Sequence, residues 1–254
     1  MPKDRQAPLP LNMAARVASE IREEIASAKL KPDEFLPPEH MLMLRFAVSR
    51  PTLREALRIL QSEGLVKIIR GSRGGAMILA PDPRRIAAYA GVLLQMRNTT
   101  IIEVFEARIL VEPDALARVA QIGDRAVLST LSQNVAAQHF LIEDRPAFYR
   151  AGRDFREVFL ENCGSEALRL IGLMLGYIAD RQLSLLSERL PYSVDQEARF
   201  LTAVRLKETM LEAMVGRRFD DVRACWVQYL RTYMNDLLKT TPDALRSMEP
   251  FPLV

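Results

Sequence analysis

Apolar residues recur along most of this chain at the three- to four-residue spacing of amphipathic helices. In the first part of the chain this spacing predicts helices over residues 11–30 and 39–46 and a short helix from Ser49 to Gly64. Further helices are predicted over 84–97, 101–121, 124–141, 145–162, 165–190, 194–216 and 219–240. No run in this second part alternates with a period of two, so we expect an antiparallel all-α helical bundle of six or seven helices there.

The short helix that begins at Ser49 has two different faces. Serine is a good helix N-cap, Pro51 falls in the first turn, where its missing N–H is not needed, and Gly64 is typical of a helix C-terminus. One face is an apolar stripe of Leu53, Leu57 and Leu60, and another carries Arg50, Arg54 and Arg58. A helix that packs with one face and offers guanidiniums with the other suits the major groove of DNA.

Two β-rich runs follow this helix, at 65–69 and 76–79, and the glycine-rich turn 71–75 separates them. A helix followed by a β-hairpin is the second half of a winged helix-turn-helix, and the two preceding helices supply the first half. Residues 30–38 are predicted as a break between those two helices. The sequence therefore predicts a mainly α protein with three parts: an N-terminal winged helix-turn-helix with a small β-hairpin wing (11–80), a stiff linker (81–83) and an all-helical domain (84–240).

The positive charge of the chain is concentrated in its first part. Residues 1–80 hold 13 Lys and Arg against 9 Asp and Glu, whereas residues 81–254 hold 22 against 23. The predicted wing contributes Lys67, Arg70 and Arg73 beside glycines that let backbone N–H groups approach phosphates. For the helix alone, a solvated basic face is the plain alternative. The hairpin favours a DNA-reading domain joined to a domain that does not touch DNA.

The stretch PPEHMLMLRFAVSRPTLREALRILQSEGLVKIIRGSRGG, residues 37–75, resembles the DNA-binding domain of the GntR family of bacterial transcription regulators. That family's pattern is a Pro-x-Glu-Arg-Glu-Leu helix, then Val-Ser-Arg-x-x-(Val/Leu)-Arg-Glu-Ala-Leu, then Glu-Gly-Leu-Val and a glycine-containing wing. The match is specific because it fixes residue identities over about forty positions rather than over one short signature.

The resemblance implies which residues contact DNA. Ser49, Arg50, Thr52 and Arg54 match the positions that contact the operator, and Gly71, with Arg70 beside it, matches the wing tip that enters the minor groove. An arginine can bind a guanine in bidentate fashion, whereas Ser49 and the wing more readily hold phosphates. Two positions depart from the family. His40 stands where an arginine is usual, and Pro51 stands where a small polar residue is frequent.

The helical part resembles the ligand-sensing (FCD-type) domain of the FadR branch of the same family. VFEARILVEPDALARVAQ (104–121) is similar to that domain's Arg-x-x-x-Glu-x-x-Ala-x-x-x-Ala helix, with Arg108 and Glu112 on its characteristic positions. FREVFLENCGSEALRLI (155–171) is similar to a second segment. The resemblance implies a domain that dimerises and binds a small-molecule effector.

Many such domains hold a divalent metal with one Asp and three His. In this chain those positions carry Gly152, Arg156, Lys207 and Tyr229, so none of the ligands is present. The chain has only two histidines, His40 in the DNA-binding part and His139 elsewhere, and a packing or surface role suits His139 better than a lone ligand role. We expect no metal site and no cofactor.

The same substitutions suggest an anionic effector. If the cavity of the domain is retained, Arg108, Arg156 and Lys207, with Tyr229, place several positive charges around it. Buried cations need a counter-charge, which a carboxylate or an acyl-coenzyme A would supply. The alternatives are that Glu112, Glu157 or Glu208 supplies it, or that Arg156 and Lys207 face water.

The sequence indicates a cytoplasmic protein without a membrane segment. The apolar stretch 170–179 is too short to cross a bilayer, and the N-terminus lacks the apolar core of a signal peptide. Cys163 and Cys225 lie far apart in helical patterns and are interpreted as reduced packing residues. Residues 1–10 and the tail 241–254 are expected to be loosely held.

These features favour a sequence-specific transcription regulator, most often a repressor in the family, that acts as a homodimer on a pseudo-palindromic operator and responds to an effector. The alternative is a dimeric DNA-binding protein without an effector, whose helical domain only dimerises; a filled bundle core would favour it. An enzyme is disfavoured because the sequence shows no nucleophile–base constellation and no phosphate-binding glycine loop before a helix.

Overall fold

The computed structural model describes residues 13–27, 29–71, 74–80, 82–187, 196–240 and 248, and the chain divides into two compact units, 1–82 and 83–254. The predictions for residues 1–10 and for the tail lie outside the described residues, apart from Met248. Pro83, predicted as the end of the linker, is the first residue of a helix in the second unit. Each unit is described by itself below.

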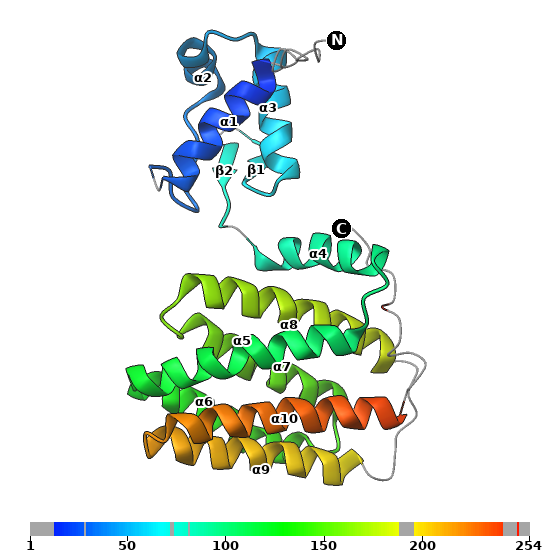
Figure 1. Cartoon of the computed structure of the whole chain (residues 1–254). Coiled ribbons are helices and arrows are strands. Elements are labelled where there is room, and N and C mark those ends of the chain that lie inside the picture. The colour runs from blue at the N-terminus through cyan, green and yellow to red at the C-terminus, as the bar shows by residue number, and fades with distance from the viewer. Residues whose placement is uncertain are drawn as a thin grey trace, which may run out of the picture. The chain divides into compact units, whose positions relative to one another are not determined.

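The first unit is a winged helix-turn-helix (Figure 1). Its elements are α1 (Met13–Ala26), α2 (Glu39–Phe46), α3 (Arg50–Ser62), β1 (Val66–Ile69) and β2 (Gly75–Ile78). The two strands are antiparallel and pair from Val66 with Ile78 to Ile69 with Gly75. The predicted helices and hairpin are thus confirmed, with strand limits that differ by one residue at each end of the hairpin.

The local chemistry of α3 follows from its sequence. The predicted apolar stripe of Leu53, Leu57 and Leu60 is buried in the core of this unit. Ser49 is the N-cap residue, but its hydroxyl lies 2.9 Å from the Thr52 hydroxyl and makes no capping hydrogen bond to the backbone. Gly64 adopts a φ of 75° just after the helix, a left-handed conformation that glycine reaches without strain.

One pairing of this unit was not predicted. The segment 30–38, expected to be a break, includes Phe35, which forms a β-bridge with Met77 of β2. Ile78 N donates a hydrogen bond of 2.8 Å to Glu34 O, and Leu36 N donates one of 2.8 Å to Ala76 O. The three prolines of this segment concealed the pairing, since proline usually marks a loop.

The second unit is all-helical. Its described elements are α4 (Pro83–Met96), α5 (Ile101–Ile122), α6 (Arg125–Gln138), the 3₁₀ turn η1 (His139–Leu141), α7 (Arg145–Glu161), α8 (Glu166–Ser187), α9 (Gln196–Val215) and α10 (Phe219–Thr240). In Figure 1, α9 and α10 lie side by side, and α5 lies between α10 and α8. The predicted helix 124–141 is in fact α6 followed by a 3₁₀ turn. The predicted boundary around residues 190–194 lies outside the described residues.

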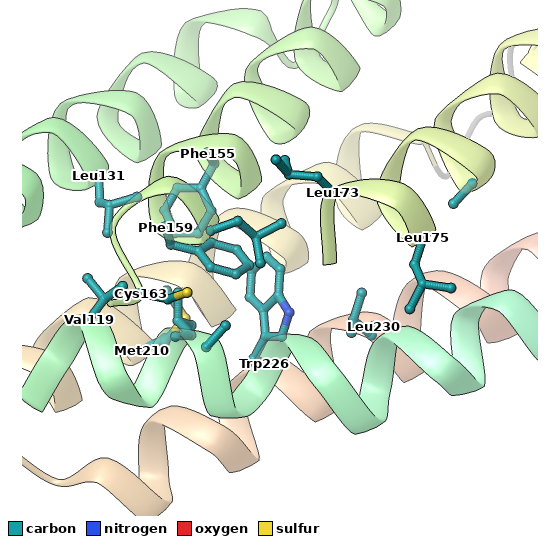
Figure 2. Close-up of a cluster of buried hydrophobic side chains, with 14 of the residues drawn as sticks. Val119, Leu131, Phe155, Phe159, Cys163, Leu173, Leu175, Met210, Trp226 and Leu230 are labelled. Atoms are coloured by element: carbon teal, nitrogen blue, oxygen red, sulfur yellow. The ribbon is translucent and has the colours of Figure 1, made fainter. Parts of the chain in front are cut away.

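The core of the second unit is centred on Trp226 of α10. Its indole is 1% exposed and stacks on Phe155 of α7 at 5.7 Å between ring centroids. Phe159, one turn further along α7, meets the same indole edge-on at 5.2 Å. Figure 2 shows these rings together with aliphatic side chains from neighbouring helices. Burying one such side chain contributes about 1.5–3 kcal/mol, so this cluster fixes α7 against α10.

The start of α5 also has a local explanation. Thr100 accepts a hydrogen bond from the Glu103 backbone N–H, and the Glu103 carboxylate accepts one from the Thr100 backbone N–H. This capping box satisfies two N–H groups that the helix itself cannot pair. None of the described helices has an apolar stretch long enough to cross a membrane. Cys163 and Cys225 are both free thiols, as predicted.

Candidate DNA-binding surface and ligand cavity

The arginines of α3 lie on the surface of the first unit. The side chains of Arg50 and Arg54 are 64% and 59% exposed. Glu39, at the start of α2, lies 3.2 Å from Arg50 Nε and 3.8 Å from Arg54 Nε, so one carboxylate bridges both guanidiniums. Exposed ion pairs of this kind contribute at most about 1 kcal/mol each. Both guanidiniums therefore remain available to a stronger partner.

The other predicted DNA contacts lie on the same unit. Ser49 is exposed and Thr52 half-buried in the first turn of α3, next to Arg50, and His40 is exposed on α2. Arg70 and Gly71 are exposed at the end of β1. Gly71 has a φ of 123°, a conformation that favours glycine. Arg73, which the sequence also placed on the wing, lies outside the described residues.

The second unit contains a cavity of about 410 Å³. It lies between α5, α7, α8 and α10, and its charged lining consists of Arg108, Arg145, Arg150, Arg153, Arg156 and Asp180. Its aromatic lining consists of Phe105, Phe148, Tyr149, Tyr229 and Tyr233. Five arginines against one carboxylate make the lining electropositive, and the rings offer flat apolar surfaces. Such a lining suits a small organic anion.

Arg108 of α5 has a partner on its own helix. Its guanidinium donates to the Glu112 carboxylate, with Nε 2.6 Å from Oε1 and Nη2 3.2 Å from Oε2. Trp226 Nε1 donates to the same carboxylate at 2.9 Å. Glu112 is fully buried, so these hydrogen bonds are what allow its charge to remain inside the bundle. Of the counter-charges considered from the sequence, Glu112 is the one found.

Arg156 of α7 is 4% exposed, and both its terminal nitrogens donate to the Asp180 carboxylate of α8. Burial disfavours the charged form, but the carboxylates of Asp180 and Glu112 outweigh it and raise the pKa of the guanidinium. The alternative that Arg156 faces water is wrong, and so is its pairing with Glu157. Glu157 lies instead 3.8 Å from Arg84.

Lys207 of α9 is fully buried, so the alternative that it faces water is also wrong. Its Nζ donates to Gln138 Oε1 at 2.8 Å and lies 4.7 Å from the centroid of the Tyr229 ring. Glu208 does not pair with it, since that carboxylate lies 2.8 Å from His139 Nε2 on the surface. Burial, followed by the positive charge of Arg156, lowers the pKa of Lys207 to about 7.

The four predicted effector residues therefore lie at different places. Arg108, Arg156 and Tyr229 line the cavity, whereas Lys207 lies behind the lining. Burial raises the pKa of Tyr229 to about 12, which keeps its hydroxyl protonated at neutral pH. His139 has the surface role that the sequence suggested. Among the described residues, no three His, Cys, Asp or Glu side chains lie close enough to hold a metal ion.

The sequence did not identify several residues of the cavity. Arg145, Arg150 and Arg153 precede Arg156 on α7. Arg145, Gly152 and Arg156 are seven and four residues apart, and this spacing is a sequence signal that places them on one helix face. Asp180 and Gln138 carried no such signal, because each lies on a different helix from the cation it contacts.

The fold and these surfaces are those of one class of protein: a winged helix-turn-helix transcription regulator joined to an all-helical domain. Residues 13–74 match the family described as bacterial regulatory proteins, gntR family, and residues 103–232 match the FCD domain. The chain belongs to the GntR family, in the branch that carries an FCD domain, and regulators of this family are not enzymes.

Individual relatives agree with this assignment. The gluconate operon transcriptional repressor of Bacillus subtilis (strain 168) is 26% identical over 220 residues, which is 82% of each chain. The transcriptional repressor NanR of Edwardsiella tarda (strain FL6-60) is 30% identical over 149 residues, and the match covers 58% of this chain but only 56% of that relative. A solved structure of Streptococcus agalactiae GntR has a TM-score of 0.63 at 16% identity and covers 88% of this chain and 99% of its own. The structural likeness concerns the fold alone.

Proposed function

We propose that the chain is a homodimeric repressor that binds a pseudo-palindromic operator through residues 11–80 and is controlled by a small anionic effector bound within residues 84–240. The observation that carries the DNA-binding part is the exposure of Arg50 and Arg54 in the first turns of α3. A helix of this kind in a winged helix-turn-helix presents its first turns to base edges. Relatives named as repressors support repression rather than activation. A cytoplasmic location is part of this proposal, since the operator DNA of a bacterium lies in the cytoplasm.

The contacts with DNA divide into two kinds under this proposal. Arg50 and Arg54 bind guanine O6 and N7, because a guanidinium offers two parallel donors to those two acceptors. Ser49, Thr52, His40, Arg70 and Gly71 contact phosphates or the minor groove and set the register of the protein on the duplex.

The cavity supports an effector-responsive protein over one whose helical domain only dimerises. A volume of about 410 Å³ lies at the small end of the range for ligand sites. It suits a compact carboxylate better than an acyl-coenzyme A, whose nucleotide and long arm would remain outside. The relative named for a gluconate operon agrees with this class, since gluconate is a small carboxylate.

Dimerisation is supported by the exposed face of α4. Ile86, Tyr89, Leu93 and Met96 recur at spacings of three, four and three residues and are 42–74% exposed. The opposite face of α4 packs on α8, so this apolar stripe has no cover among the described residues of one chain. Its spacing is that of helices that pair along a seam. Under this proposal the same stripe of a second copy covers it, because a pseudo-palindromic operator is bound by a dimer with two-fold symmetry.

Selection of a duplex from a random DNA library, followed by gel-shift titration, tests this function. We expect the wild-type chain to enrich a site of two inverted half-sites and to bind it as a dimer. Adding small carboxylates then tests effector control, with the corresponding neutral sugars or esters as controls. Enrichment of no sequence from the library would contradict the proposed function.

A further inference from the structure

The buried charges next to the cavity do not balance. Two of the three buried cations have a carboxylate partner: Arg108 pairs with Glu112, and Arg156 pairs with Asp180. Lys207 has none, because within the described part of the chain its partners are one neutral amide and three aromatic rings. An isolated ammonium inside a protein is strongly disfavoured unless a counter-charge is supplied. The bundle therefore lacks one negative charge at Lys207.

The surroundings of Lys207 hold its nitrogen in place. Gln138 Nε2 donates to Asn134 Oδ1 at 2.6 Å, and Asn134 Nδ2 donates to the backbone oxygen of Ala151 at 3.1 Å. This chain of hydrogen bonds turns Gln138 Oε1 toward Lys207 Nζ. The rings of Phe148 and Phe155 lie 5.8 Å and 5.5 Å from the same nitrogen. One of the three N–H donors of an ammonium is used by Gln138, which leaves donors for another acceptor.

Gly152 connects this nitrogen to the cavity. Gly152 belongs to the cavity lining, and a Cβ placed on it would have one neighbour within 4 Å, namely Lys207 Nζ at 4.0 Å. Any larger residue at position 152 would fill the space between the cavity and the ammonium. With glycine at position 152, no side chain separates the cavity from Lys207 Nζ at this point of α7.

We propose that Lys207 is the anion-binding residue of the helical domain, and that a carboxylate of the effector enters beside Gly152 and forms an ion pair with its ammonium. This inference rests on the proposed effector control and deepens it. One missing charge matches a carboxylate, whereas the second charge of a phosphate monoester would have no buried counterpart. The arginines and rings of the cavity then hold the remainder of the molecule.

Proton uptake follows from the surroundings of Lys207. The groups that face it are Arg156 on α7, Tyr229 on α10 and Gln138 on α6; Asp180 on α8 and Glu112 on α5 are engaged by the two arginines. Because the lysine is half-protonated near pH 7 without ligand, a bound carboxylate raises its pKa and draws a proton from solvent. The affinity for the carboxylate is then nearly constant between about pH 5 and pH 6 and falls about tenfold per pH unit above pH 7.

The first experiment needs no knowledge of the effector. G152D places a carboxylate beside Lys207 within the chain, and G152N is its neutral isostere. Both are made in the wild-type and K207M backgrounds, and thermal unfolding is measured at pH 7. We expect G152D to unfold at a higher temperature than G152N when Lys207 is present, and this difference to disappear in K207M. Equal differences in the two backgrounds would overturn the proposal.

The second experiment uses sodium gluconate, sodium glucuronate and sodium benzoate as probes, with glucose and methyl benzoate as neutral controls. Calorimetry in buffers of different ionisation enthalpy measures the protons taken up. We expect a bound probe to take up close to one proton at pH 8 and to bind K207M at least thirtyfold more weakly. Binding without proton uptake and unchanged in K207M would overturn the proposal. If G152D does not fold, or if no probe binds, the remaining experiment decides.

Operator binding separates this inference from the proposed function. The same preparations are titrated with the selected duplex. Intact operator binding with no coupling between positions 152 and 207 rejects only the role of Lys207. If the effect of G152D depends on Lys207 but the chain binds no specific duplex, the proposed function is rejected and the anion site at Lys207 is retained.

Discussion

Gly176 of α8 lies directly against the guanidinium of Arg156 on α7. A Cβ at position 176 would be 2.4 Å from Arg156 Nε and 2.8 Å from its Cζ, closer than such atoms approach. The arginine can therefore reach Asp180, one turn further along α8, only because residue 176 has no side chain. The position of Arg156 in the cavity lining therefore depends on glycine at position 176.

We expect G176A to lower the free energy of unfolding by about 1–3 kcal/mol, because the added methyl displaces a buried and paired guanidinium. Denaturant unfolding followed by circular dichroism measures this change. G152A is the matched control: its Cβ on α7 would meet only Lys207 Nζ, at an ordinary contact distance of 4.0 Å, and alanine in a helix gains about 0.5–1 kcal/mol over glycine. Equal effects of the two substitutions would contradict the role given to Gly176.

Arg50 and Arg54 are expected to determine operator specificity. Each of R50A and R54A should weaken binding to the selected duplex by about 1–3 kcal/mol, the contribution of one bidentate contact to guanine. Binding to unrelated DNA should change much less. Gel-shift titration at fixed salt measures both. R223A, which removes a half-buried arginine from the helical unit, is the control, and an equal loss in that variant would show that the effect is not specific to α3.

Stability should depend on pH through Lys207. The lysine has its ordinary pKa of 10.5 in the unfolded chain and a value of about 7 in the folded chain. Between these values the unfolded chain binds the additional proton, so the folded state gains stability as pH rises, by at most about 1.4 kcal/mol per unit. We expect the unfolding free energy of the wild-type chain, measured relative to K207M, to increase from pH 7 to pH 9. A flat difference would contradict this, because it would show that Lys207 keeps its proton in the folded state up to pH 9.

The stripe on α4 predicts which substitution separates the dimer. L93E places a carboxylate at the centre of this stripe and should shift the chain toward the monomer by tenfold or more in dissociation constant, because a charge must be desolvated to pair the helices. Sedimentation over a concentration series measures this. L110E alters another exposed leucine, on α5, and should leave the dimer intact. Dissociation caused by L110E alone would place the interface elsewhere.

The helices of this protein were predictable because their information is local. Periodic apolar positions located every described helix to within a few residues, and the pair Arg108–Glu112 was visible because its members are four residues apart. Asp180 lies 24 residues from Arg156, and Gln138 lies 69 residues from Lys207. Such pairings depend on how helices pack, which no spacing along the chain encodes. The β-bridge of Phe35 was missed for the same reason, since its partner lies 42 residues away.

Glu39 shapes how the protein meets DNA under the proposed function. Its carboxylate pairs with both Arg50 and Arg54 in the free protein. A phosphate of non-specific DNA must therefore compete with this carboxylate before it can bind either arginine. A matching sequence offers base acceptors to both guanidiniums at once and wins that competition. Glu39 at the start of α2 therefore weakens non-specific binding to DNA. The protein can then move along the chromosome until it meets a sequence whose bases bind both arginines.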